Sequence, residues 1–156
     1  MPPRRDSEEG TLNIAILELS LRNDLAELAV AAAQVDRFCA THGLSPDIAF
    51  AVNLSVDELL TNTIRYGYPN GGSHRIAMTV RLDGGVLQVE LEDEAEPYDP
   101  TTVPHPDIGA PIEARPIGGL GVHFVREMMD GFAYRRGEDR NIVTLTKHTQ
   151  SGGIAS

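Results

Sequence analysis

The feature that most constrains the fold is a pair of apolar runs that meet at a tight turn. Apolar side chains occupy every second position over 76–82, and a second strand-like run follows over 86–92. Between them lies Asp83-Gly84-Gly85, a sequence typical of a β-hairpin turn. These runs predict two antiparallel strands, and alternation of this kind is typical of a sheet with only one covered face.

The rest of the chain predicts the helices that cover this sheet. Apolar residues recur at helical spacing over 25–39, before a stop at Gly43. Ser45-Pro46-Asp47 combines an N-cap, a first-turn proline and an acidic residue, and the helix that it opens should reach Tyr66. We further predict a strand over 12–19, a helix over 120–130 and a closing hairpin over 132–136 and 142–147.

The order of these elements predicts the fold class and the domain limits. It indicates an α+β protein, a two-layer sandwich with a mixed, mostly antiparallel sheet and helices on one face. The proline-rich stretch 94–118 has no periodicity and predicts a long loop. We expect a single domain over 11–148, with flexible tails at 1–10 and 149–156.

Charge and cysteine content narrow the classes of function. A formal net charge of −10 over 156 residues argues against non-specific binding to nucleic acid or to an anionic membrane. The one cysteine, Cys39, excludes an internal disulfide and follows Phe38 on an apolar helical face, as a small core residue would. No apolar run approaches the ~20 residues of a membrane span. We therefore expect a cytoplasmic protein.

Two polar residues interrupt the apolar helix over 46–66. Glu58 and Asn62 lie one turn apart, beside the small side chains of Ala51 and Ser55. A carboxylate and an amide on a mostly buried helix need partners, so they could face a ligand. On this stretch alone, a solvated edge in which Glu58 pairs with Arg65 is slightly favoured.

A second candidate site follows the strand over 86–92. Asp93 stands at the end of that strand, where its carboxylate could accept a hydrogen bond from an exocyclic amine such as that of adenine. The acidic run formed by Glu92, Asp93, Glu94 and Glu96 could instead hold a hard cation, or be a solvated turn.

A glycine-rich turn is the third candidate. Gly118-Gly119-Leu120-Gly121 precedes and opens a predicted helix, where unpaired backbone N–H groups favour phosphate. No Lys-Ser/Thr pair follows it and no strand precedes it, so it is neither a P-loop nor a Rossmann fingerprint. A flexible hinge is the alternative.

Taken in this order, the three stretches resemble the GHKL ATPase superfamily with its Bergerat ATP-binding fold. The closest likeness is to the stand-alone anti-sigma regulatory factors that act as serine-protein kinases. The family's Glu-x-x-x-Asn is matched by Glu58 to Asn62, and its Gly-Gly-Leu-Gly by 118–121. Its Asp-x-Gly followed by Pro-Phe-Asp-Pro corresponds to Asp93-Glu-Ala95 and then to the sequence over 97–100.

The resemblance implies a role for each matched residue. Glu58 would be the catalytic residue that orients or deprotonates the attacking hydroxyl, Asn62 would hold Mg²⁺ against the phosphates, and Asp93 would take the adenine amine. The segment 101–117 would be a lid over the phosphates. The full set of implied cofactor-binding residues is Asn62, Asp93, Ala95, Arg115, Gly119, Leu120, Gly121, Val122 and Thr144.

The resemblance also implies a function with ATP and Mg²⁺ as cofactors. We expect a serine-protein kinase and anti-sigma factor that phosphorylates a small antagonist protein, sequesters a sigma factor, or does both, and that could form a homodimer. Ala95 stands where the family has glycine. This departure favours the alternative, a partner-sequestering module whose nucleotide is weak, structural or absent.

Overall fold

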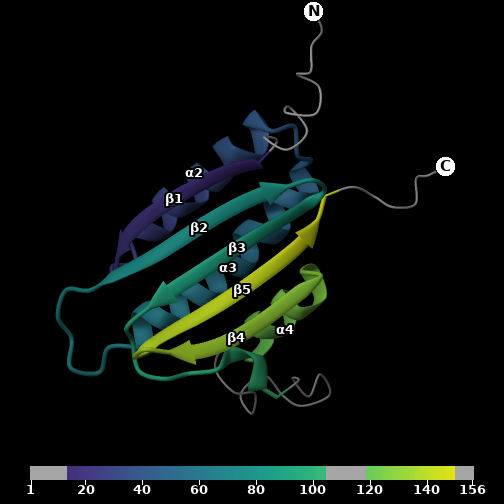
Figure 1. Cartoon of the computed structure of the whole chain (residues 1–156). Coiled ribbons are helices and arrows are strands. Elements are labelled where there is room, and N and C mark those ends of the chain that lie inside the picture. The colour runs from purple at the N-terminus through teal and green to yellow at the C-terminus, as the bar shows by residue number, and fades with distance from the viewer. Residues whose placement is uncertain (1–13, 105–118, 150–156) are drawn as a thin grey trace, which may run out of the picture.

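The computed structural model describes residues 14–104 and 119–149, which form one five-stranded sheet with three helices on one face (Figure 1). The strands are β1 (Ile14–Arg22), β2 (Arg75–Asp83), β3 (Val86–Asp93), β4 (Gly131–Gly137) and β5 (Arg140–His148). The helices are α2 (Glu27–Thr41), α3 (Pro46–Tyr66) and α4 (Gly119–Met128), with a 3-10 turn at Pro100–Thr102. The predicted two-layer α+β sandwich is confirmed.

The sheet order is β1-β2-β3-β5-β4, and every pairing between described strands is antiparallel. The expectation of a mixed sheet was therefore wrong. The cause is the last hairpin. Strand β4 forms the edge, and β5 turns back to lie between β4 and β3, so both of these strands pair with β5 in antiparallel fashion and not with each other. Glu138 and Asp139 make that turn with φ of 51° and 63°, the positive values that a type I′ turn requires.

Helix α3 begins and ends where the sequence predicts. Ser45 caps it, because its Oγ accepts a hydrogen bond from the Ile48 N–H at 3.3 Å, and Gly67 follows its last turn. The buried side chains of α3 pack against the inner faces of β2 and β3, with α2 and α4 on either side (Figure 1). The centre of this core is formed by Val52, Val56, Leu60, Met78, Val80, Leu87, Val89 and Leu145.

Ser45, the cap of α3, and Ser55, within α3, give opposite predictions for stability. Ser45→Ala removes the capping acceptor and is expected to lower the free energy of unfolding by about 1 kcal/mol. Ser55 is fully buried, and its Oγ bonds to nothing in the described part of the chain. Ser55→Ala is therefore expected to raise the free energy of unfolding by about 1 kcal/mol. Urea unfolding of both variants measures the two changes, and equal signs would contradict this account.

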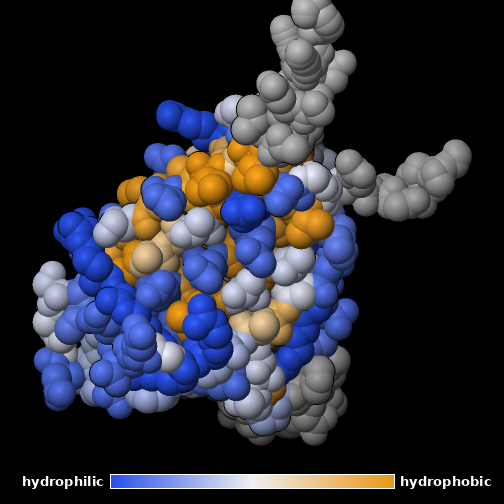
Figure 2. Space-filling view, in the orientation of Figure 1, coloured by the Kyte–Doolittle hydropathy of each residue, from blue (hydrophilic) through white to orange (hydrophobic). Residues whose placement is uncertain are grey.

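The face of the sheet away from the helices is open to solvent. Figure 2 shows this face as mainly hydrophilic, with apolar side chains gathered near the start of β1. Ile14 and Ile16, at the start of β1, are 41% and 53% exposed. Cys39, by contrast, is buried in the core, as its place on an apolar helical face predicted.

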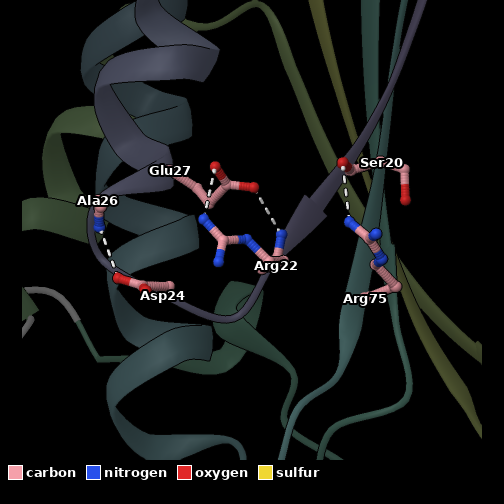
Figure 3. Close-up of polar contacts among 6 residues, drawn as sticks. All are labelled: Ser20, Arg22, Asp24, Ala26, Glu27 and Arg75. Carbon is pink, nitrogen blue, oxygen red and sulfur yellow. Dashed lines mark hydrogen bonds and ion pairs between the residues drawn. The ribbon is translucent and has the colours of Figure 1, made fainter.

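The junction between β1 and α2 is held by short polar contacts (Figure 3). The Arg22 backbone N–H donates to Glu27 Oε1 at 2.8 Å, and the Arg22 guanidinium lies 3.7 Å from Oε2. Asp24 accepts a hydrogen bond from the Ala26 N–H at 2.9 Å. These bonds turn the chain from the edge strand onto the covered face.

Several predicted segments fall wholly or partly outside the described residues. These are both tails, apart from Thr149, and most of the loop and lid over 105–118.

Strand β1 reaches Arg22, beyond the predicted end at 19, because its inward side chains continue to the buried Leu21. No helix within 14–104 or 119–149 is long and apolar enough to cross a membrane.

Candidate functional site

A cavity of about 430 Å³ opens where α3 and β3 both end. Such a volume suits a small-molecule ligand. Its wall comes from four parts of the chain: the last turns of α3, the end of β3, the segment 95–100 and the start of β5. The lining residues that carry polar chemistry include Asn62, Asp93, Tyr98 and Asn141.

Glu58 is bonded to Asn62, which lines the cavity. The Asn62 Nδ2 donates to Glu58 Oε2 at 2.8 Å, and both side chains are half-buried. Glu58 has no ion pair in the part of the chain that the structure describes, so the alternative pairing with Arg65 was wrong. Burial raises the pKa of Glu58, the bond from Asn62 lowers it, and the Asp57 carboxylate raises it. The balance is upward, so the ionised carboxylate is a stronger proton acceptor than an ordinary glutamate.

The first turn of α4 lies directly against Glu58. A Cβ built on Gly121 would lie 2.0 Å from Glu58 Oε1 and 2.6 Å from Oε2, so only glycine fits there without movement. The first N–H groups of a helix lack partners within it, and they carry the positive end of the helix dipole. The structure thus brings together the Glu58 stretch and the glycine turn, two stretches that are far apart in the sequence.

The other residues of the glycine turn are placed less fully. Gly119 and Leu120 begin α4. Val122 is fully buried. Gly118 and Arg115 lie outside the described residues.

Asp93 is held at the cavity by two donors to one of its oxygens. Its Oδ1 accepts from the Ala95 N–H at 3.0 Å and from Asn141 Nδ2 at 2.9 Å. No described residue bonds to Oδ2. Burial raises the pKa of Asp93, whereas the bonds from Asn141 and Ala95 and the charge of Arg136 lower it. The cavity therefore presents an acceptor oxygen to any ligand that offers an N–H group.

Ala95 packs its methyl group against Gly67. A Cβ built on Gly67 would lie 2.7 Å from the Ala95 Cβ, and the Glu96 N–H donates to the Gly67 carbonyl at 2.9 Å. Among described non-glycine residues only Glu138 and Asp139 have positive φ. Ala95 therefore needs no glycine-like backbone, and its side chain fills the space that Gly67 leaves.

Thr144 is not brought to the cavity. It alternates with Asn141, Val143 and Leu145 along β5, and Val143 and Leu145 belong to the core under the helices. Successive side chains of a strand point to opposite faces, so Thr144 faces away from the helices. Asn141 and Val143 line the cavity instead. The prediction that Thr144 contacts the adenine region was therefore wrong, because its side chain lies on the other face of β5.

The acidic run does not form a cation site. Arg140 lies 3.3 Å from Glu92 Oε2 and 2.9 Å from Glu94 Oε2, and Asp93 Oδ1 accepts two hydrogen bonds from protein donors. Within the described ranges no three His, Cys, Asp or Glu side chains are grouped as metal ligands.

Sequence reasoning missed Asn141, Tyr98 as a wall residue, and Arg126. Arg126 of α4 donates from Nη2 to the carbonyl oxygens of Thr101 at 3.0 Å and of Val103, so it ties down the start of the expected lid. Burial and the charges of Glu58 and Asp99 raise the pKa of Tyr98, and Arg126 lowers it. Strand alternation was the signal that could have found Asn141, whereas no local pattern marks Arg126.

Comparison with known proteins adds three findings. Residues 21–147 match the family model described as a histidine kinase-like ATPase domain. The chain is 25% identical over 138 residues to the serine/threonine-protein kinase BtrW of Bordetella bronchiseptica, covering 84% of this chain and 97% of that protein.

The fold is also similar to a solved structure of the RsbU and RsbW domains of Rv1364c from Mycobacterium tuberculosis. The TM-score is 0.64 at 15% sequence identity, over 86% of this chain. The matched part is 32% of that chain, so this likeness concerns the fold of one portion of a longer protein.

Proposed function

This chain belongs to the family of histidine kinase-like ATPase domains, and on that premise we propose that it is an ATP-dependent serine-protein kinase and anti-sigma regulatory factor. It would phosphorylate a serine of a small antagonist protein, sequester a sigma factor, or do both, and so regulate transcription by partner switching. The relative BtrW, which carries the name of a serine/threonine-protein kinase, supports the reaction class.

The observation that carries the proposal is the contact between Glu58 and Gly121. It sets a carboxylate with a raised pKa beside the start of a helix, where backbone N–H groups favour phosphate oxygens. At the cavity, Asp93 offers an acceptor suited to the adenine amine. One site therefore combines features suited to both ends of ATP.

In this proposal each residue has a defined role in phosphoryl transfer, which needs positioning and charge neutralisation more than a protein nucleophile. Glu58 accepts the proton of the attacking serine hydroxyl. The backbone N–H groups of Gly119, Leu120, Gly121 and Val122 bind phosphate oxygens, and Asp93 and Ala95 form the adenine side.

Asn62 would hold Mg²⁺. Its Nδ2 is used by Glu58, which leaves the amide oxygen as a ligand for a hard cation. Mg²⁺ usually keeps several waters and binds through few protein groups plus substrate phosphates. A single amide oxygen therefore fits a Mg²⁺ that arrives with ATP.

Mg-ATP titration followed by a phosphotransfer assay tests the proposal. We expect calorimetry to detect Mg²⁺-dependent ATP binding, and an antagonist protein encoded nearby to gain phosphoserine. ATP binding without transfer to any candidate antagonist would contradict the kinase. Absence of Mg²⁺-dependent ATP binding would favour the alternative, a sequestering module, for which affinity to a sigma factor would be independent of nucleotide.

The proposed setting is the cytoplasm, and the protein could act as a homodimer. Analytical ultracentrifugation with and without Mg-ATP measures the oligomeric state directly.

A further inference from the structure

The Asn141 side chain is the most heavily bonded group at the cavity. Its Nδ2 donates to Asp93 Oδ1 at 2.9 Å and to the carbonyl oxygens of Glu96 at 2.9 Å and Ala95 at 3.3 Å. Its Oδ1 accepts from the Tyr134 hydroxyl at 2.7 Å and from the Tyr98 N–H at 3.3 Å. Both ends of one amide thus join β4, β5, the end of β3 and the cavity wall.

We propose that Asn141 is a positioning residue that decides which purine base the cavity accepts. The inference rests on the proposed function, because it concerns how the same cavity reads the base of its nucleotide. No residue of β5 other than Thr144 was expected there, and Thr144 faces the other side of the sheet.

The argument starts from the orientation of the amide. The Tyr98 backbone N–H can only donate, so its bond at 3.3 Å identifies Oδ1 as the acceptor end of Asn141, and the Tyr134 hydroxyl donates to the same atom at 2.7 Å. The amino end must then face Asp93. A flipped amide would set its oxygen against a carboxylate oxygen and would lose three donor contacts.

This orientation of Asn141 determines which hydrogen bonds Asp93 can make with a ligand. Asn141 is 5% exposed and Asp93 is 6% exposed, so water contributes little to stabilising the carboxylate. The Asn141 and Ala95 donors both use Oδ1, which leaves Oδ2 to the ligand. An ionised Oδ2 accepts a hydrogen bond and cannot donate one. It therefore selects a 6-amino purine over a 6-oxo purine.

The protonation state of Asp93 is the variable that Asn141 controls. Burial raises the pKa of Asp93, and the Asn141 bond is the largest influence that opposes it, ahead of the Ala95 N–H and Arg136 of β4. Glu92 of β3 raises this pKa. The Asp93 charge in turn raises the pKa of the Tyr68 hydroxyl, which follows α3. Without Asn141, Asp93 would hold its proton to higher pH and could donate to a 6-oxo group.

The test compares ATP with inosine triphosphate, which carries oxygen in place of the amine, as ligands of the full chain. The Kd of each is measured from pH 5 to pH 8.5. Wild type should prefer ATP, and the preference should fall as pH drops and Asp93 takes up a proton. In Asn141→Ala the fall should occur at higher pH, and the ATP preference at pH 7 should drop by about tenfold or more.

Two further variants keep the test valid if Asn141→Ala fails to fold. Asn141→Asp keeps the shape of the side chain but places a second carboxylate beside Asp93. This raises the Asp93 pKa further, so the ATP preference should also fall further. Tyr134→Phe removes only the hydroxyl that orients Asn141, and should shift the pH midpoint less, in the same direction. The matched control is Asn53→Ala, which breaks a similar 2.8 Å bond from an Asn amide to Asp36 at the surface and should leave the preference unchanged.

A second readout needs no nucleotide. The pH midpoint of the Asp93 carboxyl carbon, followed by NMR in the free protein, should be higher in Asn141→Ala and Asn141→Asp than in wild type. Unchanged midpoints together with an unchanged ATP preference would overturn the inference while leaving the proposed function intact. A wild-type protein that binds neither nucleotide would overturn both.

Discussion

Glu58→Gln is expected to lower the rate of phosphoryl transfer by about 10²- to 10⁴-fold, the usual contribution of a positioned general base. The amide keeps the size of the side chain, and its oxygen can still accept the bond from Asn62 Nδ2. It cannot take up the proton of an attacking hydroxyl. ATP affinity, measured by calorimetry, should therefore change little, while single-turnover transfer to the antagonist should slow.

The pH dependence of the same rate gives an independent check. Burial is the main cause of the raised pKa of Glu58. The carboxylate must be ionised to act as a base, so the wild-type rate should rise with pH through this raised pKa and then level off. Glu58→Gln should lose that rise. Asp57→Asn is the matched control: it removes the neighbouring charge that raises the Glu58 pKa, so the profile should move slightly to lower pH with the plateau rate kept. A Glu58→Gln enzyme with wild-type rates would assign the base to another group.

Helix α3 shows how far local chemistry alone can carry a prediction. Its cap at Ser45, the proline after it and Gly67 at its end are all local signals, and the structure places the helix boundaries where they predict. The hairpin of β2 and β3 has the same origin, since Gly84 takes a φ of +65° between two alternating runs. Signals of this kind depend on a few neighbouring residues, so the sequence displays them directly.

The features that the sequence left open depend on pairing across long stretches of chain. The insertion of β5 between β3 and β4 sets the register that brings Asn141 opposite Asp93, and nothing local to β5 specifies that neighbour. Thr144 was misplaced for the same reason, because a shift of one residue along a strand moves a side chain to the other face. The resemblance predicts the residue types of the proposed site, whereas the register decides which of them meet.

The contact between Gly121 and Glu58 has the second largest expected consequence. Gly121→Ala would place a methyl group 2.0 Å from Glu58 Oε1, a separation that real side chains do not tolerate. Either the carboxylate or the first turn of α4 must move, and positioning catalysis loses on the order of 10²-fold for a displacement of about 1 Å. We therefore expect phosphoryl transfer to fall by about 10²-fold or more.

A double-mutant cycle shows whether this loss acts through Glu58. Gly137→Ala is the matched control, because a Cβ there would meet only the Arg135 Nη1 at 3.7 Å, and its activity and stability should match wild type. In a Glu58→Ala background the obstructing carboxylate is gone, so adding Gly121→Ala should cost almost no further stability in urea unfolding. In the wild-type background the same substitution should cost about 1–3 kcal/mol, as overpacking does. Equal costs in both backgrounds would show that Gly121 is needed for the shape of α4 itself. A cost that disappears with the carboxylate would show that Gly121 is needed because it lets α4 approach Glu58.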